Sequence, residues 1–406
     1  MRRAGNFRLT ICDLRLVIGR CWSASLLVAC LTVPTPALSQ GPLSVQREFV
    51  LSTPGLGVGN AIIELRAGGF AAVGYADLGT STGTDAFFVR FDAAGDTLWT
   101  RSYGGEHEDF GWDVVEAVDG GFFIAGYTEA PTAGREDVLV LRLDAVGELL
   151  WERTLGCEGR DRAWSATLTT DGDIVIAGES ERVGQGGRDA YLIRIGDDGE
   201  VRWANTVDAP GDQRVYHVAR TTDGAFVSTG TTAPDGETNR DVYVIRITGD
   251  GSLGWTRSFG GAPDDVGHGV MGLAGGDVLV TGYDGSHSGG DRDVYLMRLA
   301  SNGDLRWWHH DERPGEDRAM MSALRPGGYV TVGFSMAPTG FDMVILESDA
   351  DGNEQTRTLL ERPGNDRGVM ILTAQTGEYV LAGTVDGSNS SPGDFAVLWL
   401  ASGGSH

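Results

Sequence analysis

The chain has 406 residues, a formal net charge of −25 at pH 7, and no lysine among its 32 basic residues. So acidic a surface repels nucleic-acid phosphates and anionic lipid headgroups, and the lack of lysine excludes Schiff-base chemistry. We therefore expect no nucleic acid and no membrane insertion. The length suffices for one closed domain with a large core.

Residues 1–39 have the composition of a secretory signal peptide, with arginines first, then an apolar run, then small residues before a cleavage point near Ser39. The apolar run is too short to cross a bilayer. We expect an exported protein that is secreted, periplasmic or at the cell surface. A lipid anchor on Cys30 is the alternative, because residues 27–30 resemble a bacterial lipobox. Cleavage would leave Cys157 as the remaining cysteine, which we interpret as an unreactive loop thiol.

A 52-residue repeat follows, and it is most visible in tryptophans at constant spacing. They are Trp99, Trp151, Trp203, Trp255 and Trp307. A glycine that closes an apolar run and an aspartate that opens the next run recur in seven copies. The aspartates are Asp85, Asp137, Asp189, Asp241, Asp293, Asp342 and Asp394. Such a period indicates one supersecondary unit that is repeated around or along an axis.

Each copy contains four β-rich segments and no stretch of helical periodicity. In one copy they cover residues 112–118, 122–127, 137–143 and 149–155, separated by turns that contain glycine and aspartate. The third segment is apolar on both faces, as expected of a strand packed between neighbouring sheets. We predict an all-β fold, a seven-bladed β-propeller of four-stranded blades over residues 40–406. An open β-solenoid is the alternative.

The two ends of the chain favour the closed ring. The seventh copy supplies three strands, near residues 369–373, 379–383 and 395–400, and lacks a fourth. Residues 44–51 align, at an offset of 52, with the fourth-strand segment 96–103. We therefore predict that the N-terminal strand completes the last blade, which leaves no exposed sheet edge.

Several segments resemble a known family of repeats. Residues 85–96 read Asp-Ala-Phe-Phe-Val-Arg-Phe-Asp-Ala-Ala-Gly-Asp, residues 104–105 are Gly-Gly, and residues 119–128 read Asp-Gly-Gly-Phe-Phe-Ile-Ala-Gly-Tyr-Thr. They are similar to the SBBP-type β-propeller repeats of exported bacterial proteins, and the resemblance covers essentially the whole chain after the leader. It implies an exported propeller and no particular reaction. The sixth copy departs most, with Thr356 near the tryptophan column and Glu347 where other copies have arginine.

One column does not repeat its residue type. At the residue predicted to begin each innermost strand, the copies carry Asn60, Trp112, Trp164, Tyr216, His268, Met320 and Val369. The variable loops, those from second to third strands and those between blades, should all emerge on one face, called here the long-loop face. Rings at the channel mouth on that face suit stacking on sugars or gripping a peptide with basic residues. The candidate ligand-binding residues are Trp112, Trp164, Tyr216 and His268. The alternative is that these rings plug the channel and pack on one another.

The sequence carries weaker signals for catalysis and for metal binding. His217 and His268 are near Asp212, Asp264 and Asp265, so an acid–base pair or a metal site can be drawn. The chain lacks the His-Glu-x-x-His, phosphate-loop and Cys-x-x-Cys motifs. We interpret the repeated aspartates as acceptors of backbone N–H groups in the loops. Calcium is the alternative for them, and no other cofactor is expected.

These observations favour a monomeric, non-catalytic binding propeller that recognises a carbohydrate or another protein on its long-loop face. One alternative is a polysaccharide-active lyase or hydrolase that uses the same face, with His217 and His268 as candidate catalytic residues. The other is a structural envelope lipoprotein anchored through Cys30. The sequence does not decide the ligand or whether a metal binds.

Overall fold

The computed structural model describes residues 43–402 except for several short segments. Those left out are residues 53–54, 80–82, 130–134, 157–158, 182–186, 208–210, 234–238, 287–290, 312, 314, 338–339, 363 and 387–392. The leader, Cys30 and Cys157 lie outside the described residues, so the predictions about them stay predictions. Within the described part, no helix is long and apolar enough to cross a membrane.

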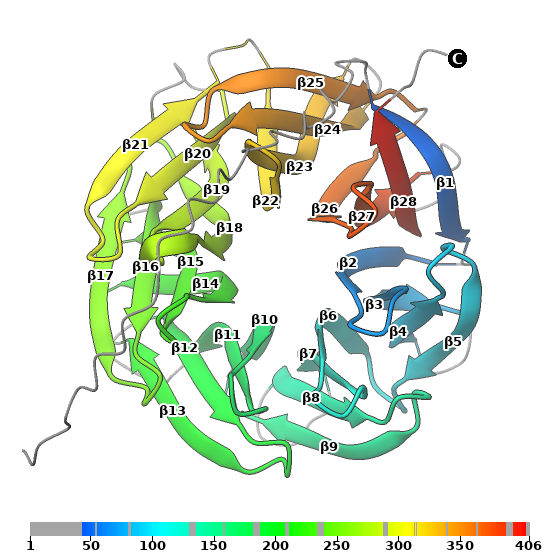
Figure 1. Ribbon diagram of the computed structural model, residues 1–406. Coiled ribbons are helices and arrows are strands. Elements are labelled where there is room, and N and C mark those ends of the chain that lie inside the picture. Colours follow the sequence, from blue (N-terminus) through cyan, green and yellow to red (C-terminus); the bar gives the residue numbers. More distant parts are fainter. Residues whose placement is uncertain are drawn as a thin grey trace, which may run out of the picture. The chain divides into compact units, whose positions relative to one another are not determined.

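Seven four-stranded antiparallel sheets stand as blades around a central axis, which confirms the predicted propeller (Figure 1). Blade 1 consists of β2–β5, and each later blade takes the next four strands, up to β22–β25 in blade 6. Blade 7 consists of β26, β27, β28 and β1. The first strand of each blade lies innermost and the fourth lies outermost.

The strand bounds follow the repeat closely. The innermost strands are β2 (Gly57–Glu64), β6 (Asp109–Glu116), β10 (Asp161–Leu168), β14 (Asp212–Arg220), β18 (Val266–Gly272), β22 (Asp317–Arg325) and β26 (Arg367–Thr373). The second strands are β3 (Phe70–Asp77), β7 (Phe122–Thr128), β11 (Ile174–Glu181), β15 (Phe226–Ala233), β19 (Val278–Asp284), β23 (Gly328–Ala337) and β27 (Tyr379–Val385). The third strands are β4 (Thr84–Phe91), β8 (Asp137–Leu143), β12 (Arg188–Ile195), β16 (Asp241–Ile247), β20 (Asp293–Leu299), β24 (Gly340–Asp349) and β28 (Asp394–Ser402). The outermost strands are β5 (Thr97–Tyr103), β9 (Leu149–Leu155), β13 (Val201–Val207), β17 (Leu253–Phe259), β21 (Leu305–His310), β25 (Glu354–Leu360) and β1 (Leu43–Leu51). A 3₁₀ turn, η1 (Ala274–Gly276), joins β18 to β19.

The N-terminal strand closes the ring as predicted. β1 pairs antiparallel with β28 along its whole length, so the two ends of the chain share one sheet. Phe49 on β1 also packs edge-on against Phe91 of blade 1 and Phe395 of blade 7, with ring centroids 5.3 and 6.2 Å apart. β1 therefore completes blade 7 and ties it to blade 1.

The core lies between the blades because the middle strands bury both faces. All seven residues of β8 are buried, which confirms the prediction that the third strand is packed on both faces. One apolar cluster joins blade 2, through Phe123 and Val140, to blade 3, through Ile174 and Tyr191. A sheet covered on both sides needs apolar residues on both sides, so the third strands do not alternate.

Arginine and tryptophan form cross-strand pairs that hold the outer parts of the blades together. In blade 2, Arg142 on β8 lies opposite Trp151 on β9. The Arg142 guanidinium is 2% exposed and bonds Asp119 of its own blade (2.8 Å) and Asp197 of blade 3 (2.7 Å). The Trp151 indole N–H donates to the Asp197 backbone carbonyl at 2.9 Å. The periodic tryptophan is therefore an inter-blade contact in this blade, as its repetition indicated.

Blades 6 and 7 keep this contact with different residues. Glu347 occupies the arginine position of blade 6, and it pairs with Arg325 of its own inner turn at 3.7 Å. Glu347 also accepts a hydrogen bond of 2.6 Å from the hydroxyl of Tyr379 in blade 7. In blade 7 the two residue types exchange strands, because Trp399 on β28 lies opposite Arg47 on β1. In the sixth copy the position held by arginine elsewhere is thus negatively charged, and its ionic partner is an arginine instead of an acid.

Removing residues 40–52 should lower the melting temperature of the chain that begins at residue 40. Losing the packing of the half-buried Phe49 costs up to about 3 kcal/mol, and the lost strand adds to it, so we expect a fall of at least roughly 4 °C. Differential scanning calorimetry of chains 40–406 and 53–406 measures it. Equal melting temperatures would contradict closure by β1.

Reversing one charge of the Arg325–Glu347 pair should destabilise the fold, and reversing both should restore it. The two side chains are 14% and 15% exposed, and an unpaired, mostly buried charge costs about 2–4 kcal/mol. We expect this loss of unfolding free energy in Glu347→Arg and in Arg325→Glu, and recovery of most of it in the double variant. Urea unfolding of all four proteins gives the coupling energy. Simple addition of the two losses would show that the pair does not interact.

Candidate functional site

Every innermost strand has a β-bulge at the same place. In blade 2 the pairing of β6 with β7 shifts between Gly111 and Asp113, which leaves Trp112 outside the ladder. The corresponding residues of the other blades are Asn60, Trp164, Tyr216, His268, Met320 and Val369. The innermost strands begin two to four residues earlier than predicted, so these residues do not start the strands. They are bulge residues, and a bulge redirects a side chain.

The repeating glycine of the second strand has its physical reason in this bulge. A Cβ atom on Gly126 of β7 would lie 1.8 Å from the carbonyl oxygen of Phe110, beside the bulge of β6. The same clash, at 1.8–2.1 Å, would arise at Gly74, Gly178, Gly230, Gly282, Gly333 and Gly383. Only glycine lets the two backbones approach so closely. The glycine column therefore marks the bulges.

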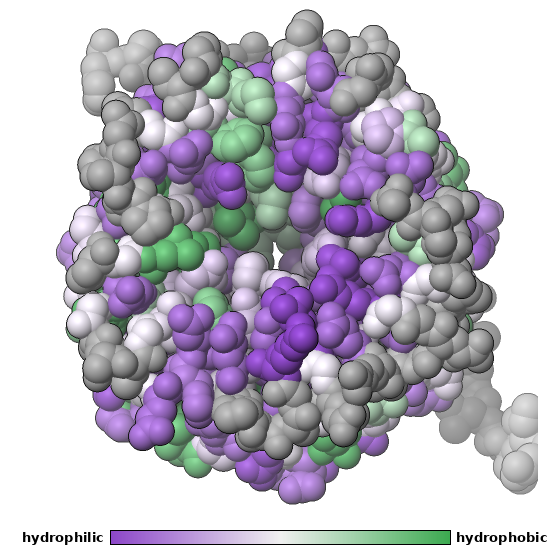
Figure 2. Space-filling view, turned by 180° about the vertical axis from the view of Figure 1, so that it is seen from behind, coloured by the Kyte–Doolittle hydropathy of each residue, from purple (hydrophilic) through white to green (hydrophobic). Residues whose placement is uncertain are grey.

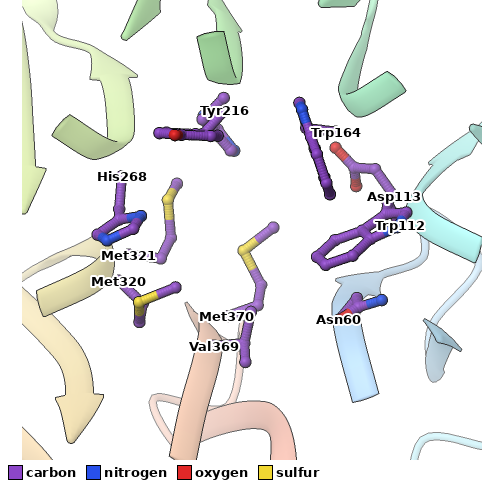
Figure 3. Close-up of a pocket in the computed structure, with 11 residues that line it drawn as sticks. Asn60, Trp112, Asp113, Trp164, Tyr216, His268, Met320, Met321, Val369 and Met370 are labelled. Atoms are coloured by element: carbon purple, nitrogen blue, oxygen red, sulfur yellow. The ribbon is translucent and has the colours of Figure 1, made fainter. Parts of the chain in front are cut away.

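The bulges direct side chains into one cavity of about 280 Å³ in the central channel. All seven bulge residues line it, together with Asp113, His217, Met321 and Met370, each of which follows a bulge residue. Figure 3 shows Trp112 and Trp164 on one side of this space, with His268, Met320 and Met321 on the other. Figure 2 shows the ring hollowed at its centre, with hydrophilic residues along much of the margin. The structure thus brings all four predicted ligand-binding residues together.

The predicted rings form a continuous arc and also pack on one another. Trp112 and Trp164 meet edge to face, with centroids 4.5 Å apart. Tyr216 lies 6.3 Å from Trp164 and 5.7 Å from His268. Each of the four rings is partly exposed. The arc therefore combines both interpretations, since its rings support each other and still line the cavity.

Asp113 is the one carboxylate among the described residues that line the cavity, and the sequence analysis missed it. Its side chain is 5% exposed, and it accepts hydrogen bonds of 2.9 Å from the Ser165 hydroxyl and the Ala166 backbone N–H of blade 3. Burial raises the pKa of this carboxyl from 3.8 to about 6, although those hydrogen bonds oppose the shift. Asp113 therefore links two blades and is only partly protonated at neutral pH.

The two candidate catalytic histidines are not paired with the predicted acids. Burial lowers the pKa of His217 and of His268 from 6.5 to about 4, so both rings are neutral at pH 7. The His217 ring bonds the Val270 backbone instead. Asp265 accepts backbone N–H groups from Gly261 (2.8 Å) and Gly285 (3.0 Å). The acid–base arrangement drawn from the sequence is therefore absent from the described residues.

Aspartates of the inter-blade loops accept backbone hydrogen bonds, as predicted for repeated aspartates, while that role of the seven third-strand aspartates stays a prediction. Besides Asp265, Asp109 accepts the Gly105 N–H at 3.1 Å and Asp366 accepts the Asp386 N–H at 2.9 Å. In the described part of the chain, no three His, Cys, Asp or Glu side chains gather as a metal site. Calcium binding stays an untested prediction.

A second hollow of about 470 Å³ lies among the long loops of blades 4 to 6. Asp264, Asp291 and Glu316 line it together with a single cation, Arg292, which bonds Glu316 at 3.1 Å. Glu316 is also paired with Arg318, so the three carboxylates exceed the guanidinium groups bonded to them by one. The loops that form it emerge on the long-loop face.

Replacing Asp113 with Asn should change the pH dependence of stability. A folded-state pKa of about 6 against 3.8 in the unfolded chain means that the folded state binds the proton more tightly. This contribution is fully present below about pH 3.8 and is lost as the pH rises through 6, a change of about 3 kcal/mol. Relative to Asp113→Asn, the wild-type chain should lose that much unfolding free energy between pH 3.5 and pH 6.5. Urea unfolding of both proteins at each pH measures this. If the pKa of Asp113 is not raised, the difference in unfolding free energy between the two proteins stays the same at every pH.

Comparison with known proteins gives a fold and no family. No family model matches the chain. A stretch of 66 residues is 38% identical to the regulatory protein FlaEY of Caulobacter vibrioides, which covers 16% of this chain and 7% of that protein.

Solved structures resemble the whole ring at low identity. The Pan2 WD40 domain of Neurospora crassa matches with a TM-score of 0.55 and 11% identity, over 91% of this chain and 98% of that one. Sqt1 of Chaetomium thermophilum matches with 0.50 and 11%, over 88% and 100%. YCF48, solved with a bound D1 peptide, matches with 0.51 and 11%, over 90% and 99%. The chain is therefore similar to WD40-type propellers in fold.

Proposed function

We propose that this protein is an exported, non-catalytic binding propeller that takes an apolar side chain of another polypeptide into its central channel. The observation that carries the proposal is the set of seven bulges. They aim residues that differ from blade to blade into one shared cavity, while the blades themselves repeat. A rigid scaffold that presents variable residues at one place is the usual arrangement for recognition.

The dimensions and the lining of the cavity favour a polypeptide over a sugar. About 280 Å³ is near the lower limit for ligand pockets, and it suits one large side chain. Trp112 and Trp164 meet at an interplanar angle of 82°, so one ring covers part of the other. Stacking on a sugar needs a broad uncovered ring face. An apolar side chain needs only a closely fitting apolar wall, which rings and thioethers supply.

The acidic hollow supports a basic residue in the same partner. Asp264 and Asp291 lie on the long-loop face, where their negative charge would favour an arginine or lysine of the partner. The net charge of −25 would steer such a partner toward the protein. The bound peptide of the structurally similar YCF48 is a precedent for a propeller that holds a peptide.

The polysaccharide-active alternative finds no matching side chains in the described cavity. Hydrolysis of a glycosidic bond ordinarily requires two carboxyl groups on either side of the bond. Asp113 is a single carboxyl group, and it already accepts hydrogen bonds from blade 3. His217 and His268 are neutral and lack an acid partner among the described residues, so they do not replace the missing group.

Replacing Trp112 and Trp164 with alanine should weaken peptide binding. Peptides selected from a random display library on the purified protein should combine a large apolar residue with nearby Arg or Lys. Loss of a central anchor site costs at least about 2 kcal/mol, so the double variant should bind them roughly 30-fold more weakly by isothermal titration. Trp151→Ala, on the outer rim, is the matched control and should bind normally. Selection of glycans alone from an array, or equal binding by the double variant, would overturn the proposal.

A further inference from the structure

One side of the channel cavity is rich in soft donor atoms. Two imidazoles and three thioethers line it, from His217, His268, Met320, Met321 and Met370. They come from the neighbouring blades 4 to 7, and Figure 3 shows the labelled members of this set around the same space. Figure 3 shows Asn60 and the two tryptophans across the cavity from His268. The donors are therefore gathered in one arc of the ring.

Two of these donors lie against the backbone at Gly269 and the residue after it. Gly269 follows His268 on β18 and has no side chain, and the Met321 sulfur lies only 2.9 Å from where a Cβ atom would be. The His217 ring bonds the backbone of the next residue, Val270. The thioether of blade 6 and the imidazole of blade 4 thus both contact the short backbone segment 269–270 of blade 5.

His217 has the arrangement of a metal ligand. One ring nitrogen is used in the hydrogen bond to Val270, and the other, Nδ1, is buried without a hydrogen-bond partner among the described residues. A metal-binding histidine usually donates its second ring N–H to a backbone carbonyl or a carboxylate, which fixes the ring and the free lone pair. Leaving a buried acceptor unpaired is costly unless something binds it.

We propose that this side of the cavity binds one Cu(I) ion through His217 Nδ1 and Met321 Sδ, with His268 and Met320 completing the ligand set. Thioether and neutral imidazole donors select Cu(I) over hard cations. Because the described residues hold no cluster of three His, Cys, Asp or Glu side chains, Zn(II) should bind poorly. This proposal uses the same cavity as the proposed function but needs no peptide partner, so a copper titration without peptide tests it separately.

The test uses the full chain with its cysteines replaced by serine, because thiols also bind Cu(I). The replaced residues are Cys12, Cys21, Cys30 and Cys157. Titration under nitrogen against the bicinchoninate complex of Cu(I) should show one ion per chain. Loss of a group that merely orients a ligand costs about 10- to 100-fold in affinity, so Met321→Leu and His217→Gln should each cost at least about that much. Met343→Leu removes a buried methionine outside the cavity and should leave the affinity unchanged.

X-ray absorption of the unsubstituted site provides a second measurement, which does not depend on the folding of any variant. It should show sulfur together with nitrogen around the copper. No binding at one ion per chain, unchanged affinity in folded Met321→Leu and His217→Gln, or a copper shell without sulfur would each overturn the proposal. Equal affinity for Zn(II) would do the same.

Discussion

The pairing of β1 with β28 is the contact on which the rest of the structure depends. It joins the two ends of the described chain in one sheet and so removes the two edges that an open array of blades would expose. Closure also fixes how far each innermost strand lies from the axis. The seven bulge residues can enclose a cavity only because the ring returns to its start. The site is thus a property of the whole ring, and no single blade contains it.

The same kind of contact recurs between neighbouring blades even where the residues that form it differ. Arg142 bonds acids of two blades, whereas Glu347 reverses the charges and bonds Arg325 and Tyr379. Trp399 and Arg47 exchange strands and still face each other. Each solution gives a buried charged group an opposite charge or a hydrogen bond, which is what burial requires. A comparison that requires the same residue type in every copy counts Glu347 as a departure, although the ionic contact is kept.

The sequence predicts the strands and the closure because both depend on local, repeated signals such as turn glycines, aspartates and apolar runs. The bulges are different, since a bulge is a relation between two strands. Its own residue ranges from Asn60 to Trp112 to Val369, so the predicted strand starts were wrong by two to four residues. Asp113, Met321 and Met370 were missed because regular alternation places the next residue on the other face, and a bulge suspends that rule. The glycine column, exemplified by Gly126, was the available signal.

A bulge residue is free to vary because it stands outside the hydrogen-bonded ladder. Replacing Trp112 leaves the pairing of Gly111 with Gly126 and of Asp113 with Ala125 in place, since those backbone bonds do not involve its side chain. The glycine opposite must stay, whereas the side chain at the bulge can be any that fits the channel. Within one strand, the residues of the ladder therefore maintain the fold, while the bulge residue is left to determine what the channel can bind. It also accounts for a cavity with tryptophans on one side and an imidazole with thioethers on the other, in a protein whose blades are otherwise copies. The asymmetry of the lining is therefore the part of the structure that the fold does not require, and it is where the binding specificity of the chain should be sought.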